Sequence, residues 1–220
     1  TLRHWDIQAS TSVGSYSLGA FPIQVFTFSA DMRLALATDA NRKFHLWEVD
    51  PFKLVRSWDA AAAAVLCLAI SPDGSHALSG GMDNNVTLWD LETGKAVAVW
   101  SGHTSFVHSV AFSPDGSRAL SGGRDNTVRL WETASGRSLG AWLGHTDAVL
   151  SVAFSQDGTR ALSGGSDYGV KLWDTASLSP EGTLLTTWSS HKGWVLHAMF
   201  SADGSHVISC SADKTVHVRE

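Results

Sequence analysis

The 220-residue chain has little cysteine and little proline, with two and five of these residues respectively. Small secreted domains that lack a sufficient core are usually rich in cysteine, because disulfides staple them. The sequence excludes that class. Cys67 and Cys210 both fall in predicted strands, where a buried single thiol is the ordinary interpretation. The lack of a disulfide framework favours a reducing compartment, and we expect a cytoplasmic location.

Long hydrophobic runs and clusters of positive charge are missing as well. No stretch reaches the ~18 apolar residues of a membrane helix, and no N-terminal signal pattern is recognisable. We therefore expect no membrane association. Charged residues make up 17% of the chain, and the formal net charge is −5. Direct nucleic-acid binding is not expected, because it requires a clustered basic face that neutralises phosphates.

Tryptophan, in contrast, is abundant and evenly spaced. Nine of the ten tryptophans fall into two series with a period of 42 residues, extended once to 46. A turn aspartate recurs at the same steps. A constant period of this size is the signature of a repeat architecture. The members are Trp5, Trp47, Trp89, Trp131 and Trp173; Trp58, Trp100, Trp142 and Trp188; and Asp31, Asp73, Asp115, Asp157 and Asp203.

The best-preserved copies of the repeat are residues 101–135 and 143–177, which are identical at 24 of 35 positions. Within the first copy, four short apolar or alternating segments lie near 106–113, 117–123, 127–131 and 137–142, and each indicates a strand. Ser-Pro-Asp-Gly at 113–116 suits a type I turn between the first two segments. No segment has helical periodicity over ten or more residues. The sequence therefore predicts an all-β fold.

Two landmarks recur in each regular unit. Gly-His stands at 102–103 and 144–145, and each pair precedes a tryptophan, Trp131 or Trp173. With these landmarks the chain resembles, over its whole length, the WD-repeat family, whose units run about 40–45 residues. The resemblance implies a β-propeller, in which four-stranded antiparallel blades surround a central channel.

We expect one domain over residues 1–220, with units at 1–20 (partial), 21–58, 59–100, 101–142, 143–188 and 189–220 (partial). The pattern gives 21 strands, or about five blades. A five-bladed ring would have one strand too many, so we interpret the chain as part of a seven-bladed ring. An incomplete ring leaves sheet faces uncovered and strand edges unpaired, which would favour self-association.

Each regular unit carries a His, a Ser, an Asp and a Trp, which invites a Ser-His-Asp catalytic interpretation. Catalysis needs one such constellation with an exposed nucleophile, whereas this one recurs once per unit. The family resemblance implies instead a structural chain of hydrogen bonds from Asp and His through Ser to the indole N–H, since buried indole and imidazole groups require partners. Ala61 replaces the His of one unit, and Arg219 replaces the last Trp. The expected network residues are His103, Ser121, Asp125, Trp131, His145, Ser163, Asp167, Trp173, Ser79, Asp83, Trp89, His191, Ser209 and Asp213.

The sequence predicts neither a metal site nor a cofactor. The histidines do not form the close-set His/Cys pairs of metal sites. The Ser-Gly-Gly triplets follow a strand but do not open a helix, so they lack the context of a phosphate-binding loop.

The two regular copies differ at five positions that flank the innermost strand or the turn between the second and third strands: 105, 106, 108, 124 and 126. In a propeller these positions meet on one face, around the channel mouth. Aromatic, Met and Arg side chains on such a rim are typical of protein-binding hot spots, although the same residues could pack between blades. The candidate partner-binding residues are Phe106, His108, Arg124, Leu150, Tyr168, Trp194, Leu196 and Met82.

Two classes of function remain open. The first is a non-catalytic recognition module or scaffold that holds a protein or peptide on this rim. The second is a sensor or regulatory segment of a larger multidomain signalling enzyme with an ATPase or kinase effector, because near-identical adjacent units resemble the repeat arrays of such proteins. A stand-alone hydrolase is the least favoured interpretation.

Overall fold

The computed structural model describes residues 2–6, 11–16, 22–59, 63–177 and 179–220, the first two ranges as backbone. The described residues form 21 strands and no helix. A hairpin of β1 (Leu2–Asp6) and β2 (Thr11–Tyr16) precedes five antiparallel sheets, and in each sheet the strands lie side by side in chain order. The predicted all-β fold with four-stranded antiparallel blades is confirmed.

The five sheets have strands of four to eight residues. The first two sheets are β3 (Ile23–Phe28), β4 (Leu34–Asp39), β5 (Lys43–Val49) and β6 (Phe52–Asp59), and β7 (Val65–Ile70), β8 (His76–Gly81), β9 (Asn85–Asp90) and β10 (Lys95–Ser101). The next two are β11 (Val107–Phe112), β12 (Arg118–Gly123), β13 (Val128–Glu132) and β14 (Ser138–Trp142), and β15 (Val149–Phe154), β16 (Arg160–Gly165), β17 (Val170–Asp174) and β18 (Thr183–Trp188). The last is β19 (Val195–Phe200), β20 (Val207–Ser211) and β21 (Val216–Arg219).

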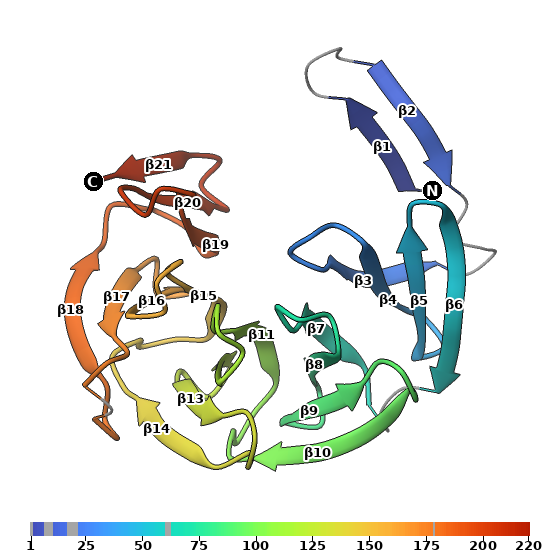
Figure 1. Cartoon of the computed structure of the whole chain (residues 1–220). Helices are drawn as coiled ribbons and strands as arrows, with labels where there is room; N and C mark the ends of the chain where they lie inside the picture. Colours follow the sequence, from blue (N-terminus) through green and yellow to red (C-terminus); the bar gives the residue numbers. More distant parts are fainter. Residues whose placement is uncertain (1, 7–10, 17–21, 60–62, 178) are drawn as a thin grey trace.

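The sheets follow one another along an arc (Figure 1). Their first strands, β3, β7, β11, β15 and β19, line the inner side and contact one another in sequence, whereas β6, β10, β14 and β18 form the outer side. This is the arrangement of propeller blades around a channel. Closure into a seven-bladed ring and self-association of an open ring both stay predictions.

The recurring aspartate fixes the turn between the first and second strand of each sheet. Asp115 Oδ1 accepts hydrogen bonds from Ser113 Oγ at 2.5 Å and from the backbone N–H of Ser117 at 3.1 Å. Gly116 follows with φ of 70°, a conformation that glycine adopts without steric cost. These bonds lower the pKa of Asp115 to about 2, with the Ser113 hydroxyl as the largest cause.

Most of the core lies between neighbouring sheets, and one smaller cluster around Trp47 belongs to β3–β6 alone. Between β11–β14 and β15–β18 the core comprises Leu120, Leu130 and Trp142 from the first sheet with Val149 and Trp173 from the second. A side chain at Gly122 would lie 2.6 Å from Val149 Cγ1, so glycine permits this close approach. The sheets are therefore held together by face-to-face burial of apolar surface.

The two cysteines are free, but they differ in their surroundings. Cys67 is buried, and burial raises the pKa of its thiol to about 12. Cys210 is only half-buried, because no further described sheet follows β19–β21 along the arc (Figure 1). The buried environment expected for both thiols therefore holds for Cys67 alone.

Candidate partner-binding rim

The buried histidine of each regular unit ties two loops together beneath the rim. His103 Nδ1 lies 2.9 Å from Asp125 Oδ2, and His103 Nε2 lies 2.7 Å from Ser121 Oγ. The same hydroxyl accepts a hydrogen bond from the indole N–H of Trp131 at 2.8 Å. Asp125 also accepts the backbone N–H of Thr104 at 2.9 Å. The loop before β11 is thus fastened to the turn between β12 and β13.

The next unit repeats this geometry. His145 lies 2.9 Å from Asp167 and 2.7 Å from Ser163, and the indole of Trp173 donates to Ser163 at 2.8 Å. Burial opposes ionisation of Asp167, but hydrogen bonds from His145 and from backbone N–H groups outweigh it and lower the pKa to about 2. The carboxylate is therefore ionised at neutral pH and anchors the turn as an acceptor.

Two other units keep part of the arrangement. In the last sheet His191 lies 2.8 Å from Ser209 and 3.2 Å from Asp213, and Arg219 Nη1 replaces the indole as donor to Ser209 at 3.1 Å.

In β7–β10 the indole of Trp89 donates to Ser79 at 2.8 Å, but Asp83 accepts from the backbone of Asn85 at 3.2 Å. Ala61, which stands where the other units carry histidine, lies outside the described residues.

Sequence reasoning missed a different network in β3–β6. His45 Nε2 lies 3.1 Å from Asp39 Oδ2, and its Nδ1 lies 2.9 Å from Ser57 Oγ. Asp39 and His45 are both buried. In the 42-residue alignment Asp39 falls at the position of Gly123 rather than that of Asp125, so a comparison of like positions does not reveal it.

The candidate rim residues all lie at one end of the sheets. The pairs Val107↔Gly123 and Val149↔Gly165 show that the start of each inner strand meets the end of the second strand. At this end, Arg124 donates its backbone N–H to Phe106 O at 2.8 Å, and its guanidinium lies 5.7 Å from the centre of the Phe106 ring. Arg124 is exposed and Phe106 is half-buried, so the pair forms one surface feature.

The other candidates differ in exposure. His108 and Leu150 are half-buried, and burial, followed by the charge of Arg124, lowers the pKa of His108. The remaining four side chains are exposed, so packing between the described sheets does not bury them. They are Met82 at 45%, Tyr168 at 44%, Trp194 at 54% and Leu196 at 49% exposure.

Among the described residues, no group of three or more His, Cys, Asp or Glu side chains could hold a metal ion. No helix in the described part of the chain is long and apolar enough to cross a membrane.

Comparison with known families matches the repeat described as "WD domain, G-beta repeat" at residues 52–90, 94–132, 136–174 and 182–219. The chain belongs to the WD40 repeat family. Each match begins with the outer strand of one sheet and ends with the third strand of the next, so a sequence repeat spans two sheets. No curated protein matches the chain. WD40 repeats generally act as scaffolds for protein–protein interaction, and WD40 propeller domains are typically non-catalytic.

Proposed function

We propose that the chain is a non-catalytic recognition module that binds a protein or peptide. The binding site is the rim at the end of the sheets where the inner strands, such as β11, β15 and β19, begin. We also propose that binding takes place in the cytoplasm. The observation that carries this proposal is the exposure of Trp194, Tyr168 and Leu196 at the same end of the sheets as the Arg124–Phe106 pair. Exposed aromatic and Arg side chains on a rigid support are typical of binding hot spots.

The burial of the His-Ser-Asp sets supports a non-catalytic role. Ser121 and Ser163 are both fully buried, and each hydroxyl already contacts a histidine and an indole. A hydrolytic nucleophile has to reach its substrate. The recurring sets therefore suit support of the rim loops rather than turnover.

A photo-crosslinking side chain in place of Ser105, next to Phe106, would identify the partner that occupies the rim. The affinity of that partner would then be measured for the native chain and for Arg124→Ala and Trp194→Ala. We expect each change to weaken binding by about tenfold or more, because hot-spot truncations cost about 2 kcal/mol. Leu185→Ala is the matched control, since Leu185 is an equally exposed side chain on the outer strand β18. Equal affinity in all four proteins would refute the rim site.

The second candidate is a sensor segment of a larger signalling enzyme. The near-identity of 101–135 and 143–177, at 24 of 35 positions, favours it. Both candidates use the rim in the same way. Binding of the rim partner would change the ATPase or kinase activity of the parent protein in the second case and would leave no such activity to change in the first.

A further inference from the structure

The end of the sheets opposite the rim contains a guanidinium site that the chain fills with its own side chain. Arg118, at the start of β12, reaches the next sheet. Its Nη1 donates to Thr175 O at 2.8 Å, and its Nη2 donates to Gly158 O at 2.9 Å. The guanidinium carbon lies 5.9 Å from the centre of the Phe154 ring. Two carbonyl acceptors and an aromatic face form a cradle suited to a planar cation.

One repeat earlier, the same cradle is present without its arginine. A shift of 42 residues replaces Phe154, Gly158 and Thr175 by the identical types Phe112, Gly116 and Thr133, but it replaces Arg118 by His76. His76, Phe112, Gly116 and Thr133 all line a cavity of about 400 Å³ between β7–β10 and β11–β14.

His76 does not take over the role of the arginine. Its Nδ1 lies 2.6 Å from Ser75 Oγ, within its own turn. The hydroxyl of Thr133 in the cavity wall is buried and has no hydrogen-bond partner among the described residues, whereas that of Thr175 donates to Gly158 O at 2.6 Å. An unpaired buried hydroxyl is costly, and a ligand in the cavity could satisfy it.

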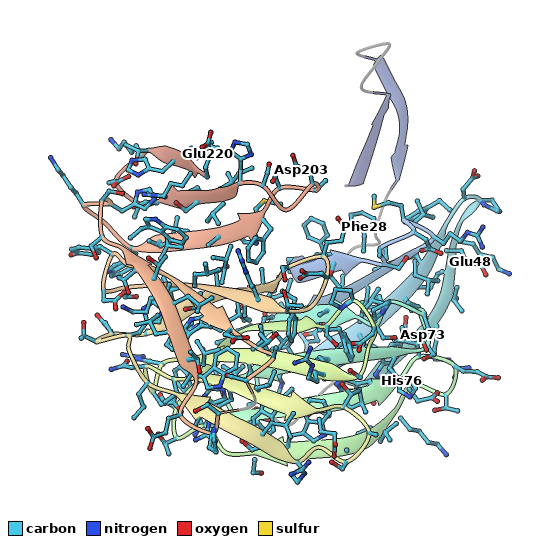
Figure 2. All side chains as sticks on the ribbon, turned by 60° about the vertical axis from the view of Figure 1, so that its left-hand side comes forward. Phe28, Glu48, Asp73, His76, Asp203 and Glu220 are labelled. Atoms are coloured by element: carbon cyan, nitrogen blue, oxygen red, sulfur yellow. The ribbon has the colours of Figure 1, made fainter. Side chains whose placement is uncertain are left out.

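The cavity also carries the charge that a cation requires. The carboxylates of Asp73 and Asp115 belong to its lining. The pKa of each carboxyl is lowered to about 2, and the largest cause is a hydrogen bond from a serine hydroxyl, Ser71 for Asp73 and Ser113 for Asp115. Both carboxylates are therefore ionised at neutral pH. Asp73 and His76 lie on the same side of the molecule (Figure 2).

Two other junctions also have cavities, of about 730 Å³ and 400 Å³, but their linings differ from that at His76. Between β3–β6 and β7–β10 the arginine position is Leu34, whose side chain lies against Gly74, and the aromatic and hydroxyl positions are Ile70 and Leu91. Between β15–β18 and β19–β21 the position is again an arginine, Arg160. Among the described junctions, the cavity at His76 therefore combines the Phe, Gly and Thr cradle with a side chain too short to fill it.

We propose that this cavity binds an arginine side chain of a partner protein, presented on an extended peptide segment, in the place that Arg118 occupies one repeat later. The guanidinium is preferred to an ammonium, because its planar fork fits two carbonyl acceptors and an aromatic face at once. Val97 borders the cavity and is 56% exposed, which gives an apolar contact for a residue beside the arginine. The site is separate from the rim and does not depend on it.

Calorimetric titration with a capped pentapeptide, alanine–valine–arginine–valine–alanine, tests the proposal. We expect it to bind about tenfold or more tightly than the same peptide with lysine or citrulline at its centre, because a hydrogen-bonded charge is lost or misplaced in each. Capped arginine alone should bind more weakly than the peptide. Equal affinity for arginine and lysine would mean an acidic surface without a cradle, and equal affinity for the peptide and capped arginine would exclude a peptide-borne ligand. Either result would overturn the proposal.

Two exchanges between the junctions sharpen the test. His76→Arg should abolish peptide binding and raise the melting temperature, because the chain would then fill the cradle itself. Arg118→His should create a second site and raise the stoichiometry from one peptide to two. His76→Ala, which leaves the cavity open, should keep the native affinity and provides the comparison if Arg118→His does not fold. Undiminished binding to His76→Arg would contradict the proposal.

Discussion

In β11–β14 the imidazole that supports the rim comes from the loop before the first strand, whereas in β3–β6 it comes from the third strand. His103 joins Asp125 in the following turn to Ser121 in β12. His45 joins Asp39, the last residue of β4, to a serine in the outer strand β6. Both arrangements place a buried histidine between a carboxylate and a hydroxyl, yet no position of one network coincides with a position of the other.

The two sheets differ at one backbone position close to the histidine. A Cβ at Gly123 would lie 2.5 Å from His103 Nδ1 and 2.8 Å from Asp125 Oδ1, so glycine permits the close His–Asp contact in this unit. The last unit carries Ser211 at this position, and there the His191–Asp213 distance is longer, at 3.2 Å. Asp39 occupies the same position in the unit that lacks Gly-His, and its carboxylate is buried there. In β11–β14 the glycine and the histidine are therefore sterically coupled, and β3–β6, which lacks the loop histidine, accommodates a side chain at the glycine position.

The largest expected effect is the loss of the loop histidine. His103→Ala should destabilise the fold by about 3 kcal/mol, because it leaves a buried carboxylate without its imidazole hydrogen-bond partner and removes one contact of a buried hydroxyl. Urea unfolding measures this change. A loss below about 0.5 kcal/mol would show that the network is dispensable.

A double-mutant cycle sharpens the comparison between the two sheets. Gly123→Ala alone should cost about 2 kcal/mol, since its methyl group overlaps the imidazole. In the His103→Ala background the cost should fall well below that value, because the space is then vacant. Strict additivity of the two changes would disprove the coupling inferred from Asp39.

A smaller effect is expected on the pH dependence of stability. The pKa of Asp167 is lowered to about 2 in the folded chain, below the ~3.9 of an unfolded aspartate. Between these values the unfolded chain binds more protons, so the stabilisation is complete above about pH 4 and is lost as the pH falls towards about 2.

Asp167→Asn should therefore cost about 1 kcal/mol at pH 7, a value reduced by solvent screening, and should flatten the loss of stability between pH 4 and pH 2. Urea unfolding at several pH values provides the measurement. Asp39→Asn is the matched change in β3–β6, where the carboxylate pKa is also lowered, against the effect of burial, by hydrogen bonds from Lys43 N–H and His45. A slope identical to that of the native chain in both variants would contradict the prediction.

The sequence predicts the regular units well, because period, turn residues and landmark positions all agree. Trp131, Asp115 and Gly116 recur at fixed steps, and each has a local role that a single unit reveals. The His-Asp-Ser set of β3–β6 could not be predicted in this way, because Asp39 and His45 lie at positions that carry glycine and arginine in the unit 101–142.

The cavity at His76 was not predictable for a different reason. Arg118 contacts Thr175, 57 positions further along the chain, and this pairing depends on how one sheet packs on the next. The junction in which Arg118 occupies the site shows which residues contact a guanidinium. Without that geometry, the presence of histidine instead of arginine at position 76 does not indicate a binding site.

The smallest effect concerns Tyr168, which has φ of 67°, a backbone conformation that bulky side chains rarely adopt. The two preceding copies carry asparagine here, Asn84 and Asn126, with φ of 66° and 68°. Tyr168→Asn should therefore stabilise the fold by about 0.5 kcal/mol, and Asn126→Tyr, its mirror in the neighbouring sheet, should cost a similar amount. If Tyr168 is strained because it serves the rim, Tyr168→Asn should also weaken binding of the crosslinked partner. A stabilised variant with native affinity would place Tyr168 outside the binding site while leaving the account of its strain intact.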